Sequence, residues 1–169
     1  MLTKLRREEG AAAVEFALIV GVLAMLLFGM LQFGVAFFAL QNLRSGAREG
    51  ARVGAVDGTG AQVKARVAAA SGISNLGSSL TVYKRTSLSS PPAACPSASC
   101  VAVGDADKPC VAPTGPTPVS TVAQIDLSSP SLPTSLQNIF TVDIPLMPSI
   151  DLRTINGPTK LYGEFRCES

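Results

Sequence analysis

The side chains that could carry chemistry are four cysteines and a scatter of carboxylates, because the chain contains no histidine. Histidine is the commonest general base and the commonest metal ligand in proteins. The acids Asp126, Asp143 and Asp151 follow no catalytic spacing, and no glycine-rich phosphate-binding loop follows a strand. The net charge of +2 gives no support to nucleic-acid binding. The sequence therefore argues against an enzyme and predicts no cofactor.

All four cysteines lie in the C-terminal half of the chain: Cys95, Cys100, Cys110 and Cys167. An even number beyond an apolar segment is typical of an oxidising, extracytoplasmic setting. Cys95 and Cys100 lack the CxxC spacing of zinc ligands, so disulfides are favoured over a metal site or free thiols. We expect a short bridge, Cys95–Cys100, and a long bridge, Cys110–Cys167. Pairing of Cys167 with Cys95 or Cys100 remains the alternative.

The apolar residues gather near the N-terminus. Between residues 16 and 40 the only strongly polar side chain is Gln32. At about 1.5 Å per residue in a helix, this run is long enough to cross a hydrocarbon core of about 30 Å. A secretory signal has a shorter apolar core followed by small residues, whereas here the alanines at 11–13 precede the run. We expect a retained membrane helix. Arginines and lysines flank both of its ends, so the cysteines and the proline-rich tail place the C-terminal part outside.

One carboxylate, Glu15, lies just inside this apolar run. A charge within hydrocarbon costs about 2.5–3.5 kcal/mol on insertion scales, so it usually has a partner. If the chain were cut after Gly10, Ala11 would become the N-terminus and Glu15 would lie one helical turn from its ammonium group. In an assembly, Glu15 could instead pair with the free amine of a neighbouring subunit. The simpler interpretation puts Glu15 at the level of the lipid headgroups.

The helical pattern continues to about residue 56. Arg44, Arg48 and Arg52 form one basic stripe at intervals of four residues. Small residues recur at the same interval and would let another helix approach closely. The candidates for this packing face are Gly46, Gly50, Gly54, Ala47 and Ala51. The alternative is a solvated extension that the glycines weaken by about 1 kcal/mol each relative to alanine.

The residues that follow this helix, 57–169, predict an α+β outer domain. Asp57-Gly58 marks a turn, and a short helix over 61–71 ends at Gly72. Residues 86–120 are rich in Ser, Pro and Ala, hold three cysteines and predict a long loop. Strands of a small antiparallel sheet are expected at 79–85, 120–127, 138–146 and 159–167, with Pro145 and Pro148 ending the third early or placing it at an edge.

Three motifs in the first third of the chain are similar to those of one protein family. They are GAAAVEFA at 10–17, the Phe-Gly pair at 33–34, and AREGAR at 47–52. Together they resemble the TadE/TadG-like family, and YGEFRCE at 162–168 is similar to the closing strand of that family. The resemblance implies a pseudopilin, or minor pilin, of a tight-adherence Flp-type pilus. It further implies an inner-membrane protein whose leader, 1–10, is cytoplasmic and is cut between Gly10 and Ala11 by a prepilin peptidase.

The implied partners are other pilins of the same system, the peptidase, the assembly platform in the membrane and the lipid bilayer. Major Flp pilins are generally much shorter and favour Tyr after the Glu. Phe16 and the large outer domain at 57–169 therefore favour an accessory subunit, with 11–56 as the membrane and assembly helix. The alternative is an uncleaved, membrane-anchored extracytoplasmic protein that binds a ligand or maintains the envelope. The two hypotheses differ in whether the chain is cut after Gly10. The candidate processing site consists of Gly10, Ala11, Glu15 and Phe16.

Overall fold

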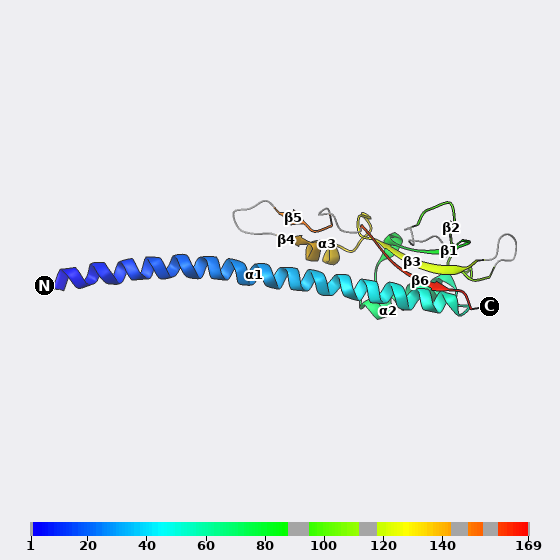
Figure 1. Cartoon of the computed structure of the whole chain (residues 1–169), viewed down its shortest axis with the longest axis horizontal. Helices are drawn as coiled ribbons and strands as arrows, with labels where there is room; N and C mark the ends of the chain where they lie inside the picture. Colours follow the sequence, from blue (N-terminus) through cyan, green and yellow to red (C-terminus); the bar gives the residue numbers. More distant parts are fainter. Residues whose placement is uncertain (1, 88–94, 112–117, 143–148, 154–158, 169) are drawn as a thin grey trace.

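The computed structural model describes residues 2–87, 95–111, 118–142, 149–153 and 159–168. A single helix, α1 (Leu2–Ala55), runs from the N-terminus into the outer domain (Figure 1). The first proline of the chain comes only at position 91, so nothing in this stretch removes a helical hydrogen bond. The helix ends at the expected turn, where Asp57 has a positive φ of 72° and Gly58 N–H bonds to the Val53 carbonyl.

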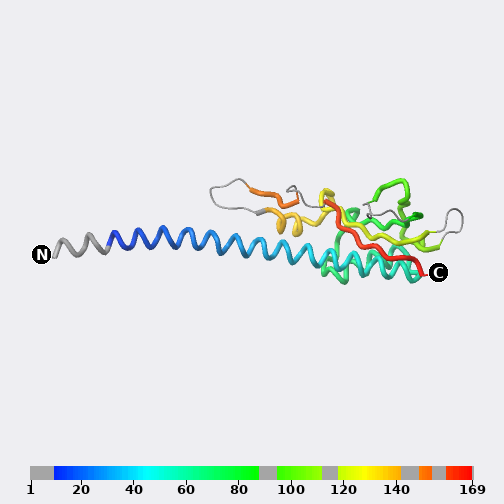
Figure 2. Tube along the Cα trace, viewed as in Figure 1, coloured from blue at the N-terminus to red at the C-terminus, as the bar shows by residue number. Residues whose placement is uncertain are grey.

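A second helix, α2 (Gly60–Ser71), lies alongside the C-terminal part of α1 (Figures 1 and 2). Its start is stabilised by a capping box between Thr59 and Gln62, in which each side chain accepts a hydrogen bond from the backbone of the other. Its end is set by Gly72, which adopts the left-handed conformation with φ of 72°. Both boundaries agree with the sequence prediction within one residue.

Four antiparallel strands form the sheet, in the order β2-β1-β3-β6. Their bounds are β1 (Leu80–Arg85), β2 (Cys100–Ala102), β3 (Ser120–Asp126) and β6 (Lys160–Arg166), and a 3₁₀ turn (Gly77–Ser79) precedes β1. Three of these strands lie where the sequence predicts them. The exception is β2, a three-residue edge strand that lies within the segment predicted to be a loop.

The prediction of a strand at 138–146 is wrong for residues 138–140. The chain instead forms a short helix, α3 (Thr134–Phe140), followed by β4 (Thr141–Val142), which pairs with β5 (Ile150–Asp151). The helix forms because Leu136 and Phe140 are four residues apart and are both buried in the core. Pro145 and Pro148 lie outside the described residues. We call α3, β4 and β5 the α3–β5 lobe.

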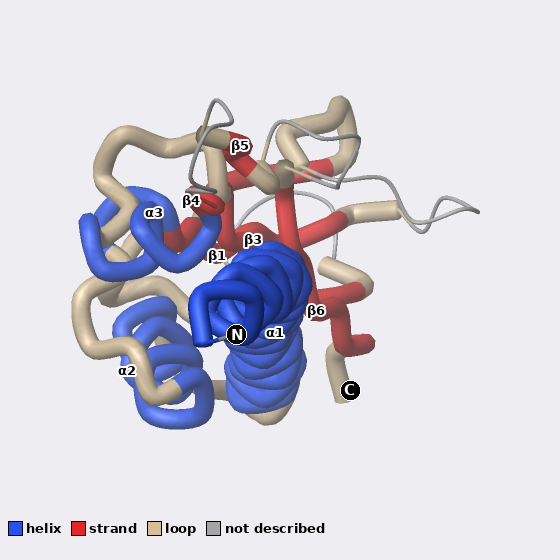
Figure 3. Tube along the Cα trace, turned by 90° about the vertical axis from the view of Figure 1, so that its left-hand side faces the viewer, coloured by secondary structure: helices blue, strands red, loops and turns tan. Residues whose placement is uncertain are grey.

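The core lies between the sheet and the C-terminal half of α1. Figure 3, which looks along α1, shows the strands passing on one side of this helix, with α2 beside it. Val82, Ala123 and Ile125 of the sheet are fully buried in one cluster with side chains of both helices. The helical members of this cluster include Leu43, Ala47, Ala51, Val63 and Val67. The molecule is therefore a two-layer α+β domain from which the first part of α1 projects.

Candidate functional site

The projecting part of α1 is a continuous exposed apolar surface. Phe16 and Leu18 are each 69% exposed, and Phe38 is 68% exposed. The other large side chains exposed between them include Ile19, Val22, Leu23, Leu26, Leu27, Phe28, Met30, Leu31 and Phe37. Within the described residues, α1 is the one helix that is long and apolar enough to cross a membrane. Exposed apolar surface of this extent marks a membrane or protein contact.

The four candidate processing residues lie near the start of this surface. The helix passes through Gly10 and Ala11 without a break, and both residues are exposed. Glu15 lies beside Phe16 on the exposed helix. Among the described residues, no hydrogen bond or ion pair reaches the Glu15 carboxylate. The structure therefore presents one isolated carboxylate at the head of an apolar helix.

The glycines of the expected packing face contact other parts of the same chain. A Cβ atom on Gly46 would lie 2.9 Å from the carbonyl oxygen of Val67, and one on Gly50 would overlap the Val67 side chain. A Cβ atom on Gly54 would lie 2.6 Å from Cγ2 of Thr121 on β3. The helix that approaches this face is thus α2, and only glycine permits so short a separation.

On a neighbouring face of α1, Ala47 and Ala51 are fully buried. Here the backbone of β6 lies against α1, because a Cβ atom on Gly163 would overlap the backbone of Ala47 and Arg48. Sequence reasoning did not single out Gly163. The available signal was a glycine within a strand pattern, which often marks a close backbone approach.

The cysteines form two disulfides, Cys95–Cys100 and Cys110–Cys167, with Cα separations of 5.9 and 5.5 Å. These are the pairs that the sequence analysis favoured. Around the longer bridge, Cys167 N–H bonds to the Val119 carbonyl, and Glu168 N–H bonds to the carbonyl of Ala55 at the end of α1. The end of β6 therefore lies beside the end of α1, and the bridge ties it to the segment that follows β2. No group of three or more potential metal ligands gathers among the residues that the structure describes.

A buried ion pair lies on the sheet face that points away from α1. The guanidinium of Arg85, whose residue is 1% exposed, is 3.1 Å from the carboxylate of Glu164, which also accepts a hydrogen bond from Ser120. The segment at Cys95 covers this face, since the Gln124 side chain exchanges two 2.8 Å hydrogen bonds with the Cys95 backbone. No local pattern predicts this pair, because its members come from strands about 80 residues apart along the chain.

Two further ion pairs join elements at the surface. Arg66 of α2 bonds to Glu49 of α1 at 2.7 Å, and this hydrogen bond lowers the pKa of the Glu49 carboxyl. The pair therefore stabilises the α1–α2 contact fully at a pH above the ordinary carboxyl pKa. This stabilisation is lost as the pH falls through the lowered pKa of Glu49. In the lobe, hydrogen bonds from Arg153 likewise lower the pKa of the Asp151 carboxyl.

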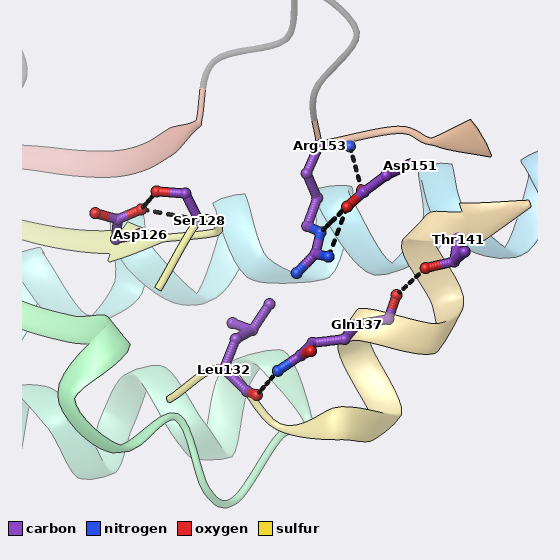
Figure 4. Close-up of polar contacts among 7 residues, drawn as sticks. All are labelled: Asp126, Ser128, Leu132, Gln137, Thr141, Asp151 and Arg153. Carbon is purple, nitrogen blue, oxygen red and sulfur yellow. Dashed lines mark hydrogen bonds and ion pairs between the residues drawn. The ribbon is translucent and has the colours of Figure 1, made fainter. Parts of the chain in front are cut away.

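Figure 4 shows how polar contacts hold the α3–β5 lobe together. The Gln137 side chain donates to the Leu132 carbonyl at 2.6 Å, and the Thr141 hydroxyl donates to the Gln137 carbonyl at 3.0 Å. The guanidinium of Arg153 is held at Asp151 and extends from β5 toward α1 (Figure 4). Within the described residues, α3 and β4 of the lobe contact α1.

These features define a class: a protein with one exposed apolar helix of membrane-spanning length, whose C-terminal end is built into a small disulfide-stapled α+β domain. Residues 10–52 match the family model described as TadE-like protein. The match covers the four candidate processing residues, the apolar run and the packing-face residues up to Ala51, and it includes the three N-terminal motifs of the sequence analysis. No curated protein and no solved structure matches this chain. The family match and the apolar helix together support a minor-pilin-like membrane protein associated with a Tad pilus.

Proposed function

We propose that this chain is a minor pilin of a tight-adherence Flp-type pilus, needed for pilus assembly and thereby for surface adhesion. The apolar part of α1 crosses the cytoplasmic membrane, the leader faces the cytoplasm and the disulfide-stapled domain faces outside. Prepilin peptidase removes the leader after Gly10. The mature subunit then joins other pilins through the assembly platform in the membrane.

The observation that carries this proposal is the isolated Glu15 carboxylate on the apolar helix, five residues after Gly10. In hydrocarbon an unpaired carboxylate is costly, and an ammonium group is its natural partner. Cleavage after Gly10 creates such a group at Ala11. The amine of one subunit then pairs with Glu15 of its neighbour, and both charges are compensated in an apolar setting.

The packing of α1 supports a specific location for the contacts between subunits. Its glycine face is already occupied by α2 of the same chain, and Ala47 and Ala51 are buried beneath the sheet. The apolar surface of α1 left for neighbouring subunits is therefore its exposed part, which extends from Ala11 to Phe38 and excludes the buried Ala36. The same surface contacts lipid before assembly and the helices of other pilins after assembly.

Cleavage is tested by expressing the full chain with and without the peptidase and sequencing the mature N-terminus. We expect Ala11 at the N-terminus with the enzyme and the uncut chain without it. Gly10→Leu should stay uncut, whereas the matched control Gly29→Leu, in open space on the same helix, should be cut. An uncut wild-type chain in the presence of the peptidase would favour the membrane-anchored envelope protein instead.

The charge pairing is tested by Glu15→Ala, with Gln32→Ala as the control because Gln32 is the other polar residue of the apolar run. Both variants should resist alkaline extraction from membranes, since neither adds a charge to the helix. Pilus counts by electron microscopy should fall strongly in Glu15→Ala only. Normal piliation in that variant would contradict the pairing.

A further inference from the structure

The last turns of the apolar run face two environments at once. Phe37 and Phe38 are 64% and 68% exposed, whereas Ala36 and Ala39 are 1% and 7% exposed. The two alanines belong to the same buried cluster as Leu136 and Phe140 of α3. The α3–β5 lobe therefore covers one side of α1 at the level where the opposite side still presents large apolar rings.

This arrangement locates the lobe relative to a bilayer, if the apolar part of α1 crosses one as in the proposed function. Rings at Phe37 and Phe38 lie within or at the edge of the hydrocarbon. A lobe packed on the other side of the same helical turn then lies in the headgroup layer. Arg44 follows Phe38 by six residues, or about 9 Å along the helix, which also places it among the headgroups.

A small hollow of about 50 Å³ opens at this level between α1, the lobe and β6. Its walls are apolar, and two guanidinium groups stand at it. The apolar lining includes Leu40, Phe140 and Leu161, and the guanidinium groups belong to Arg44 and Arg153. This volume accommodates a small group such as a phosphate but not a whole lipid.

The charges at the hollow do not balance. Arg153 directs Nε and one terminal nitrogen to Asp151, which neutralises one guanidinium. Arg44 makes no ion pair with any described residue, so the charges that the described residues bring to the hollow leave one positive charge in excess. Arginine matches the geometry of a phosphate group through two parallel N–H donors.

We propose that this hollow binds the phosphate of an anionic phospholipid in the outer leaflet. Arg44 contacts the phosphate, Arg153 supports it, and the acyl chains lie outside the hollow along the exposed Phe37 and Phe38 side of α1. The inference depends on the membrane insertion proposed above, because only insertion brings the hollow to the headgroup layer. It assigns Arg44 a role distinct from that of the other arginines of its stripe.

The test uses the full chain reconstituted in nanodiscs of equal parts phosphatidylcholine and phosphatidylglycerol. Native mass spectrometry measures the ratio of the two lipids that remain bound on release from the disc. We expect wild type to retain phosphatidylglycerol preferentially and Arg44→Gln to lower the ratio about fivefold, the effect of one arginine at an anionic surface. Arg44→Lys should keep most of the preference. Arg52→Gln, two turns further from the apolar run, is the matched control and should leave the ratio unchanged.

Equal ratios in wild type and Arg44→Gln would overturn the proposal, as would an equal loss in Arg52→Gln, which would indicate unspecific attraction. Alkaline extraction from vesicles of phosphatidylcholine alone reports insertion separately. A chain that resists extraction but shows no lipid preference overturns the lipid site and leaves the proposed function standing. A chain that alkali removes overturns both.

Discussion

At Gly163 the backbone of β6 lies directly against the backbone of α1, and any side chain there would overlap Ala47. We predict that Gly163→Ala lowers the free energy of unfolding by about 1–3 kcal/mol, because neither backbone can move without disturbing the core. Urea unfolding followed by the near-ultraviolet signal of Tyr83 and Tyr162 measures this change. Gly29→Ala, in open space on α1, should not destabilise the domain. Equal stability of Gly163→Ala and wild type would contradict the close contact.

The Arg85–Glu164 pair is a second feature decided by single residues. Glu164→Leu leaves the buried guanidinium of Arg85 without its carboxylate, so we expect a loss of about 3–5 kcal/mol in unfolding free energy. The double variant Arg85→Met with Glu164→Leu should be more stable than that single variant, since it buries no charge. A double-mutant cycle with urea unfolding measures the coupling. If the stability losses of Arg85→Met alone and Glu164→Leu alone simply add up in the double variant, the two side chains are not coupled.

At the scale of elements, the two disulfides join segments of very different separation. Cys110–Cys167 closes 57 residues and Cys95–Cys100 closes 5. In the chain-entropy model the longer bridge contributes about 4 kcal/mol and the shorter about 2 kcal/mol. We predict that replacing Cys110 and Cys167 by Ser lowers stability more than replacing Cys95 and Cys100. Urea unfolding of the two double variants decides this, and the reverse order would contradict it.

Elements also differ in how far local sequence predicted them. The capping box at Thr59 and the left-handed Gly72 define α2 within its own residues, so the prediction was accurate. Over 138–146 the local pattern was ambiguous, because an apolar pair such as Leu136 and Phe140 suits a helix only if something covers it. The cover is α1, which is nearly 100 residues earlier in the chain.

At the scale of the whole molecule, the proposed function puts the exposed apolar part of α1 in the membrane and the stapled domain outside. We predict that Ser45→Cys is labelled in intact cells by a membrane-impermeant maleimide, because Ser45 is exposed just beyond the apolar run. Phe28→Cys should stay unlabelled, since the proposed orientation puts this residue in mid-membrane. The four native cysteines are paired and do not react. Labelling of Ser45→Cys only after cell lysis would contradict the proposed orientation.

Patterns in the sequence predict the apolar run, the turn at Asp57-Gly58, α2, three of the four strands of the main sheet and the motifs that match the TadE-like family at 10–52. All of these depend on residues close together in the chain, where helical or strand periodicity and turn chemistry act locally.

The folded structure was needed to show which surfaces meet. It showed that the glycine face of α1 packs on α2 and that Arg85 is buried with Glu164. It also showed that the missing side chain of Gly163 lets the backbones of β6 and α1 come into contact. It also brought Arg153 to the end of the apolar run beside Arg44. These contacts join residues far apart in the chain. Their partners are set by the packing of the layers, which no local pattern of residues specifies.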